Sequence, residues 1–429
     1  MKKLSRGLPR LVPLAGVILV CMSQNAFADF TLGETTVGGM PVEARLYGFI
    51  NGEIENVKAL GGATPYNSRG RVTDGNSRIG FAGSIGVTPD VKGIWQIEAS
   101  LNSFDQGGVN DQNQQFSLSS RNTFVGVRSE KFGQAVIGNN DSVYRSLVGS
   151  GGALGGNLGL TVYGLDVWNN TSAQMTGNPN SLFSRGEARY KNSVHYLSPE
   201  WKGLQAGASY SFDEAQTNNV NHGRYSFGLK YHIGEFAVGA GYDYQSNTGV
   251  DTAALAQGMG FRTTSVSGQS TSFAKILATY KFPTKTTVGA GYEYGSYGFT
   301  QFVPPSGGNF VASTINGSMK QGSVMVSVAQ EITPKIAIMA SYGKLGNLSN
   351  PTVGNPGDYS ARQFSIGATY KVNEIFMPYV YYTKISNSSG QNVNLGQAPL
   401  FSNNSGTSNA FLAPGNSPQA FGIGLIARF

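Results

Sequence analysis

The sequence predicts an all-β fold, a 16-stranded antiparallel transmembrane β-barrel with short periplasmic turns, long external loops and an inward-folded third loop. Three observations lead to this fold class. Apolar and small or polar residues alternate with a period of two along many short segments. The connections between these segments are short and long in strict turn. No segment after the N-terminal region has 18 consecutive apolar residues, so no transmembrane helix is expected there.

The composition agrees with many short strands. Charged residues make up 13% of the chain, about half of the roughly 25% that is usual in soluble domains. Glycine is abundant, with 59 residues among 429, and aromatic residues reach 11%. Glycine and asparagine turns between short strands suit this balance better than long helices do.

The N-terminal stretch 1–28 predicts a secretory signal peptide, which leaves 29–429 as one barrel domain. Basic residues precede a short apolar run, and Ala26-Phe27-Ala28 forms a small-residue cleavage site. A lipoprotein signal at Cys21 is the alternative, but Val20 stands where a small residue is expected. Four of the 31 basic residues lie in 1–28, so with 24 acids the remainder carries about +3. Such a small excess gives no reason to expect nucleic acid as a partner.

The alternation is clear in the last eleven residues, QAFGIGLIARF, where Phe421, Ile423, Leu425 and Phe429 share one face. A strand that crosses a membrane presents such apolar residues to lipid and small or polar residues to the interior. The same pattern along the chain predicts sixteen strands, near 43–55, 76–87, 92–104, 120–130, 133–140, 187–198, 203–213, 223–233, 236–246, 271–282, 286–297, 318–331, 335–345, 360–371, 376–387 and 419–429.

The connections fall into two sets that alternate along the chain. One set has only a few residues each, and the other set consists of 56–75, 105–119, 141–186, 214–222, 247–270, 298–317, 346–359 and 388–418. An outer-membrane barrel with short periplasmic turns and long external loops gives this asymmetry, whereas a soluble sandwich does not require it. The loop 141–186 is the longest, and a loop of this length within a compact domain is usually functional or disordered. We expect it to fold into the barrel as a constriction loop.

Several short motifs resemble the Gram-negative general porins of the neisserial and β-proteobacterial type. They are Leu46-Tyr47-Gly48, Asn76-Ser77-Arg78-Ile79-Gly80-Phe81, Trp95-Gln96-Ile97-Glu98, Ser120-Arg121-Asn122-Thr123-Phe124-Val125-Gly126, Phe132-Gly133, Asn192-Ser193-Val194-His195-Tyr196, Ser198-Pro199 and the terminal Phe429. The match covers 45–213 and the C-terminus, whereas 214–375 matches by strand pattern alone.

This resemblance implies a homotrimer in the outer membrane, among lipid and lipopolysaccharide, whose third external loop constricts the pore. It also implies that the barrel assembly machinery recognises Phe429. Its expected function is general diffusion of small hydrophilic solutes and ions, without a catalytic residue, cofactor or metal.

Three arginines occupy similar positions before short turns, as a ladder of basic residues on the pore wall requires. Arg78 lies 11 residues before Pro89, Arg121 lies 10 before Lys131, and Arg189 lies 10 before Pro199. Placing an arginine against lipid near mid-membrane costs roughly 2–4 kcal/mol, which favours the lumen. The alternative is that these arginines are solvated residues scattered over strand ends.

Strand parity assigns the faces less clearly for some of these residues. Arg78 lies opposite Ile79 and Phe81 and therefore faces the lumen. Phe124 directed outward puts Arg121 inside, but it also puts Val125 and Val127 inside; the resemblance supports the inward choice. Arg189 shares a face with Lys191, Ser193 and His195, while Tyr190, Val194 and Tyr196 face lipid.

The loop 141–186 contains few acids that could face these arginines. Asp166 lies in the most apolar part of the loop, beside Tyr163, and we expect this pair to lie against the inner wall. An ordinary turn aspartate is the alternative. Arg45, Lys191 and Arg185 are further candidates for the positive side. One acid against several arginines predicts a positive constriction and a preference for anions.

Enzyme motifs are absent from the sequence, because no His-Glu-x-x-His, Gly-x-Ser-x-Gly or metal-ligand spacing occurs. Two other functions remain open beside general diffusion. One is a substrate-specific channel, for instance for organic anions or sugars, and the other is a structural or adhesive surface barrel whose long loops bind a partner.

Overall fold

The computed structural model describes residues 30–73, 77–102, 117–149, 182–303, 313–396, 400 and 412–429. Nearly all of the regular structure in these ranges is β-strand. The proposed signal peptide 1–28 and most of the loop 141–186, including Tyr163 and Asp166, lie outside the described residues.

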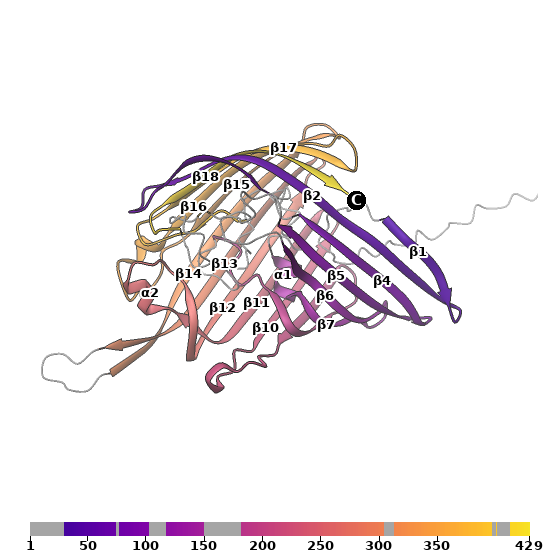
Figure 1. The fold of residues 1–429 in the computed structure, drawn as a ribbon, viewed down its shortest axis with the longest axis horizontal. Helices are drawn as coiled ribbons and strands as arrows, with labels where there is room; N and C mark the ends of the chain where they lie inside the picture. Colours follow the sequence, from indigo (N-terminus) through magenta and orange to yellow (C-terminus); the bar gives the residue numbers. More distant parts are fainter. Residues whose placement is uncertain are drawn as a thin grey trace, which may run out of the picture.

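Within the described residues, the strands follow one another along the chain with two short helices and two 3₁₀ turns between them (Figure 1). The strands are β1 (Phe30–Val37), β2 (Met40–Leu60), β3 (Tyr66–Thr73), β4 (Arg78–Thr88), β5 (Val91–Asn102), β6 (Ser117–Ser129), β7 (Gly133–Asp141), β8 (Arg189–Leu197), β9 (Leu204–Ser211), β10 (Arg224–Ile233), β11 (Phe236–Val250), β12 (Thr263–Lys281), β13 (Thr286–Val303), β14 (Ser313–Glu331), β15 (Ile336–Leu345), β16 (Ala361–Tyr370), β17 (Phe376–Asn387) and β18 (Ser417–Arg428). The helices are α1 (Val143–Val148) and α2 (Thr252–Ala256), and the 3₁₀ turns are η4 (Thr217–Asn219) and η5 (Pro356–Tyr359).

The sheet closes on itself because β2 pairs with β18 on one edge and with β4 on the other. On β2, Phe49 to Leu60 pair antiparallel with β18, and Val42 to Phe49 pair with β4. The other neighbours are consecutive in sequence and antiparallel, as Figure 1 shows for the long strands of the wall. The C-terminal Phe429 completes the closure through backbone hydrogen bonds with Gly48.

Two of the eighteen described strands, β1 and β3, lengthen the barrel wall but do not add to the number of strands around it. β1 pairs with the first half of β2 on the edge that β18 occupies further along, and β3 pairs with the second half on the edge that β4 occupies. The wall is therefore a closed barrel of sixteen antiparallel strands. This confirms the predicted fold class.

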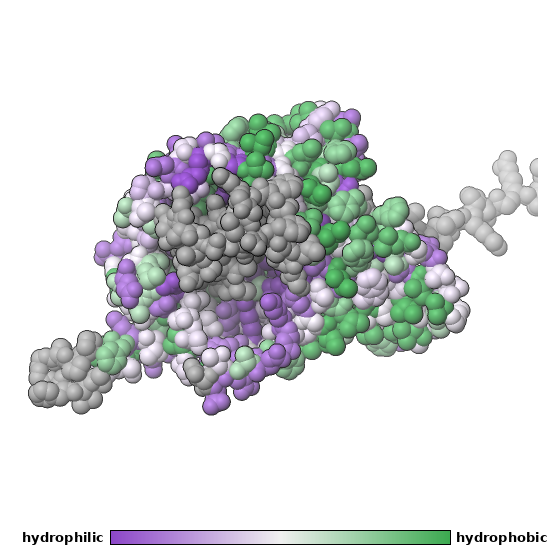
Figure 2. Space-filling model, in the orientation of Figure 1, coloured by the Kyte–Doolittle hydropathy of each residue, from purple (hydrophilic) through white to green (hydrophobic). Residues whose placement is uncertain are grey.

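The two faces of each strand have the chemistry that the alternation predicts. On β16, Phe364 and Ile366 are exposed on the outside, whereas Gln363 and Ser365 are buried on the inside. Hydrophobic residues gather along the outer wall in the space-filling view (Figure 2). In the described part of the chain, no helix has the length and hydropathy needed to cross a membrane.

The observed strands are longer than predicted at the ends that carry the long loops. β2 continues to Leu60 and β3 occupies Tyr66–Thr73, within the predicted loop 56–75. β13 and β14 likewise continue as a paired ribbon up to Val303 and Ser313, within the predicted loop 298–317. Polar sequences that read as loops form strands here because the two backbones satisfy each other's hydrogen-bonding groups.

Candidate pore constriction

Arg121 and Glu98 form the centre of a charged cluster on the inner wall. The Arg121 Nε atom lies 2.5 Å from Glu98 Oε1, and the Tyr47 hydroxyl donates a hydrogen bond of 3.0 Å to Glu98 Oε2. Arg121 Nη1 also donates to Ser100 Oγ at 3.3 Å. Glu98 was not among the predicted site residues, although it lies directly across from Gly80, two residues from Arg78.

A β-bulge directs Arg121 inward. The register of β5 and β6 shifts between Ile97–Thr123 and Ala99–Ser120, so that two residues of β6 stand opposite Glu98 alone. Beyond the bulge, Val125 and Val127 are exposed outside, and Phe124 shares the inner face with its pair partner Gln96. The prediction that Phe124 points outward is therefore wrong, since a bulge reverses the parity within the strand.

Arg189 meets Asp141 and Arg145 beside this pair. Asp141 Oδ1 lies 3.1 Å from Arg189 Nη2 and 2.8 Å from Arg145 Nε. Asn122 joins the two parts, because its Oδ1 accepts from Arg189 Nε at 2.6 Å and its Nδ2 donates to Asp141 at 3.2 Å. Arg145 was not predicted, because its place depends on how the loop enters the barrel.

Arg78 lies on the same inner face, and its side chain is buried. Its guanidinium stacks over the Phe49 ring at 4.8 Å from the ring centroid. Its outward neighbour Phe81 is 41% exposed, whereas Arg78 is only 7% exposed. We define the ladder cluster as Arg78, Arg121, Arg145 and Arg189 with Glu98 and Asp141. It contains four arginines and two carboxylates.

Two other predicted basic residues lie apart from the ladder cluster. Arg45 lines a recess near the short turns, together with Lys92 and Arg128. Lys191 is exposed and forms no ion pair with a carboxylate of the described ranges. It stands beside a second bulge, where β7 and β8 shift register between Gly138 and Asn140 and Asn192 has a φ of 45°.

The second bulge also corrects the predicted face of Tyr190. The Tyr190 side chain is 2% exposed, and its hydroxyl donates to Asp243 inside the barrel. The guanidinium of Arg224 lies 5.0 Å from the Tyr190 ring centroid. Tyr190 therefore does not face lipid, whereas Val194 and Tyr196, beyond the bulge, are exposed on the outer face.

The first part of the loop 141–186 packs against the inner wall as α1. Ser142 caps this helix by accepting from the Arg145 backbone, and the Val143 N–H donates to Ser209 Oγ of β9 at 2.9 Å. Gly241 on β11 leaves room for the helix, since a Cβ atom there would lie 2.6 Å from Val148. Burial raises the pKa of the Tyr144 phenol well above its ordinary value, so the group stays neutral.

The last part of the loop is fixed by ion pairs to β12 and β13, which follow the strand β11 on which α1 packs. Arg185 Nε lies 2.6 Å from Glu293 of β13, and Arg185 Nη1 donates to the Tyr297 hydroxyl at 2.8 Å. Lys275 of β12 lies 2.5 Å from Glu187 and 3.0 Å from Glu293. We call these four charged residues the anchor cluster. Because its two cations face two anions, Arg185 adds no net charge to the pore, contrary to the prediction.

Both described ends of the loop thus lie inside the barrel, the first with Asp141 and Arg145 in the ladder cluster and the last with Arg185 in the anchor cluster. The described residues contain no group of three or more His, Cys, Asp or Glu side chains that could hold a metal ion. A closed membrane-spanning barrel with a charged interior and an internal loop defines a channel-forming outer-membrane protein.

Comparisons with known proteins give the family. The family model of the Gram-negative porins matches residues 15–390. An outer membrane porin protein of Bordetella pertussis is 25% identical over 393 residues, which cover 86% of this chain and 91% of that protein. The major outer membrane protein P.IB of Neisseria meningitidis serogroup B is 27% identical over 226 residues, covering 50% of this chain and 59% of that protein.

Among solved structures, an anion-selective porin from Comamonas acidovorans superimposes with a TM-score of 0.64 at 16% identity, over 90% of this chain and 100% of that one. The chain belongs to the Gram-negative porin family. It is an outer-membrane diffusion channel for small hydrophilic solutes and not an enzyme.

Proposed function

We propose that the channel prefers anions and that the loop 141–186 forms its constriction. The observation that carries this proposal is the composition of the ladder cluster, in which four arginines and two carboxylates meet on the wall that α1 enters. A pore selects by the sign of the fixed charge at its narrow part, because a low-dielectric wall strengthens the field there. The excess of two positive charges favours anions.

The ends of the loop support its role in the constriction. α1 packs against β10 and β11, and the segment from Leu182 to Ala188 is buried against β12, β13 and β14. The two ends are adjacent, because the Ser142 N–H donates to the Ala188 carbonyl at 3.0 Å and the Lys275 ammonium lies 5.3 Å from the Tyr144 ring centroid. Tyr163 and Asp166 remain the residues that we expect to face the arginines from the loop.

The structural neighbour from Comamonas acidovorans is described as anion-selective, which agrees with the proposal but rests on fold likeness. Another structural neighbour, from Vibrio cholerae, is described in a trimer form. We propose a homotrimer for this chain as well. Recognition of Phe429 by the assembly machinery and contact with lipopolysaccharide remain expectations.

A substrate-specific channel is the second candidate, and one row of side chains favours it. Tyr379 and Tyr381 of β17 are buried inside, where their hydroxyl groups donate to Asn51 and to the carboxylates of Glu53 and Glu55. Hydroxyl, amide and carboxylate groups on one wall suit neutral polyhydroxylated solutes. A relative from Halomonas is named as a monosaccharide porin, at 23% identity.

Reversal potentials across a potassium chloride gradient test the anion preference. The wild-type channel should be anion-selective. Arg189→Gln should lower the anion-to-cation permeability ratio by about two- to tenfold, because one fixed charge near the ion path contributes about 0.5–1.4 kcal/mol at an intermediate dielectric. Asp141→Asn should raise the ratio. Lys335→Gln, which removes a charge from a short turn outside the pore, is the matched control.

Cation selectivity in the wild type that Arg189→Gln leaves unchanged would contradict the proposal. The constriction has its own test, because deletion of 151–156 should increase single-channel conductance. A conductance equal to that of the wild type would mean that the loop does not limit the pore. Saturable block of the current by one sugar, at unchanged ion selectivity, would favour the second candidate.

A further inference from the structure

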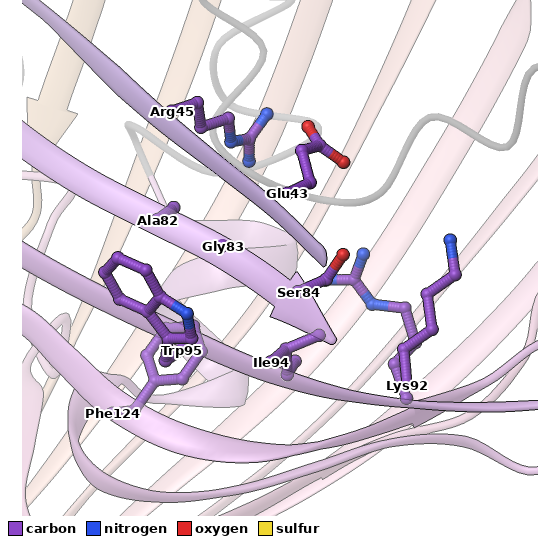
Figure 3. A pocket seen from close by; sticks show the side chains of 10 residues that line it. Glu43, Arg45, Ala82, Gly83, Ser84, Lys92, Ile94, Trp95 and Phe124 are labelled. Carbon is purple, nitrogen blue, oxygen red and sulfur yellow. The ribbon is translucent and has the colours of Figure 1, made fainter. Parts of the chain in front are cut away.

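A recess of about 150 Å³ lies on the inner wall away from the ladder cluster (Figure 3). It is much larger than the roughly 10–15 Å³ that one water molecule needs, so it can admit part of a small solute. Its lining residues come from β2, β4, β5 and β6, and they are Glu43, Arg45, Ala82, Gly83, Ser84, Lys92, Ile94, Trp95, Phe124 and Arg128.

The strand register places the charged lining residues on the inner face. Lys92 pairs with Arg128, and Arg45 pairs with Ala82, which is 2% exposed. The outward residues of the same strands include Ile97 and Val127, which are 56% and 48% exposed. Figure 3 shows Arg45, Glu43 and Lys92 extending to the same side of the strands.

The recess lies toward the ends of the strands that carry short turns. Arg128 precedes the turn between β6 and β7, and Lys92 follows the turn between β4 and β5. Short turns lie on the periplasmic side of outer-membrane barrels. Along β5, Lys92 stands six residues from Glu98, or about 20 Å at about 3.3 Å per residue. This separation exceeds the Debye length of about 8 Å at physiological salt, so Lys92 is largely screened from the ladder cluster. Arg45 stands closer, because its partner Ala82 pairs with Gln96, two residues from Glu98.

The lining combines positive charge with apolar surface. Arg45, Lys92 and Arg128 supply three cations, and Glu43 is the acid among the lining residues. Arg128 is held in place by Gln134, whose Oε1 accepts from its Nε at 3.0 Å and from its Nη2 at 2.8 Å. Gln134 is neutral, so this contact orients the guanidinium without cancelling its charge. Ile94 and Phe124 supply apolar surface beside the cations.

We propose that this recess is a periplasmic-side binding site for small organic anions, solutes with a carboxylate or phosphate group on an apolar body. The cations bind the anionic group, and Ile94 and Phe124 contact the body. The site gives an anion that has passed the ladder cluster a second place to bind before it leaves the pore. Two moderate sites in series favour conduction, because each must bind well enough to admit the solute and weakly enough to release it.

Phe124→Trp provides a direct measurement, because Phe124 is an inward residue of the recess, whereas Trp95 pairs with Gly83 and with the exposed Val125 on the outer face. Benzoate titrated into the full-length Phe124→Trp channel in lipid vesicles should change the tryptophan fluorescence in a saturable way, and Trp95→Phe in that background should leave most of the change in place. Acetate carries the same charge without a ring, so it should bind more weakly. Inorganic phosphate, which lacks an apolar body, should compete with benzoate at higher concentration.

Two variants that are expected to change benzoate affinity in opposite directions make the test specific. Lys92→Gln combined with Arg128→Gln should weaken benzoate binding about five- to thirtyfold, because two charge-assisted contacts are removed. Glu43→Gln should strengthen it several-fold, which a merely structural role for these residues does not explain. Lys335→Gln combined with Lys371→Gln removes the same charge from other short turns and should leave binding unchanged.

The site would be disproved by benzoate binding that these variants leave unchanged, by equal weakening in the control variant, or by no saturable change up to about 100 mM benzoate. The inference rests on the proposed anion preference as the route by which anions reach the site, but the fluorescence titration does not measure selectivity. Cation selectivity in a salt gradient would therefore refute the proposed function, whereas an unaltered titration would refute the site.

Discussion

The ladder cluster and the anchor cluster contain the same types of charged residue but have different roles. In the anchor cluster, the side chains of Arg185, Glu293 and Lys275 are all 0% exposed and the charges balance. In the ladder cluster, the side chains of Arg189 and Asp141 are 18% and 23% exposed, and arginines outnumber acids. The comparison teaches that solvent access and charge balance, rather than residue type, separate a structural ion pair from one that can act on passing ions.

The difference follows from the cost of removing charge from water. A fully buried ion must be paired, because the desolvation penalty of an unpaired one is several kcal/mol. The anchor cluster therefore tolerates no excess charge. Side chains beside the pore keep contact with water, so an excess of positive charge can persist there and produce a field.

The largest expected effect comes from breaking the anchor cluster. Arg185→Met leaves Glu187 and Glu293 with Lys275 alone, and we expect a loss of about 3–5 kcal/mol in the free energy of unfolding. Urea unfolding of the barrel in lipid vesicles measures it. The conductance should also become larger or more variable, because one end of the loop is released from the wall.

The double variant Arg185→Met with Glu293→Gln is the control for charge balance. It should lose less stability than the sum of the two single variants. Each single variant leaves one buried charge without its partner, whereas the double variant removes both charges of the pair. Additive losses would mean that the two side chains act independently and that the ion pair does not fix the loop.

The other end of the loop should give an intermediate effect, since α1 is held by packing against β11 in addition to the ion pair between Arg145 and Asp141. Gly241→Ala places a methyl group in space that side chains of α1 occupy, 2.6 Å from Val148 and 2.9 Å from Tyr144. Overpacking of this kind costs about 1–3 kcal/mol. Gly33→Ala, on β1 with no atom within 4 Å of the added carbon, should leave the free energy of unfolding nearly unchanged. Equal stability of both variants would show that α1 is not docked on β11.

The sequence predicted the barrel well because its signals are repeated on every strand. Sixteen alternating segments and two classes of connection agree with one another, so local errors do not alter the fold class. β1 and β3 were missed as separate strands, since each shares an edge of β2 with another strand and does not add to the number of strands around the barrel.

The site was harder to predict, because it depends on single irregularities and on distant partners. A bulge at Arg121 and another near Asn192 each reverse the parity of their strand, and period-two counting has no means of locating them. Arg185 was expected to add positive charge, but its partner Glu293 lies 108 residues away in sequence. Such a pairing depends on how the loop enters the barrel. Tyr163 and Asp166 stay predictions.

The smallest expected effect on stability comes from the ladder cluster itself. Glu98→Gln removes the acid partner of Arg121 but leaves its contact with Ser100 Oγ at 3.3 Å and the nearby carboxylate of Asp141. We expect a loss of only about 1 kcal/mol in the free energy of unfolding. The reversal potential should move toward stronger anion preference, because one of two carboxylates is lost while four arginines stay. A stability loss as large as that of Arg185→Met, with unchanged selectivity, would mean that Glu98 and Arg121 form a second anchor and would remove the distinction between the two clusters.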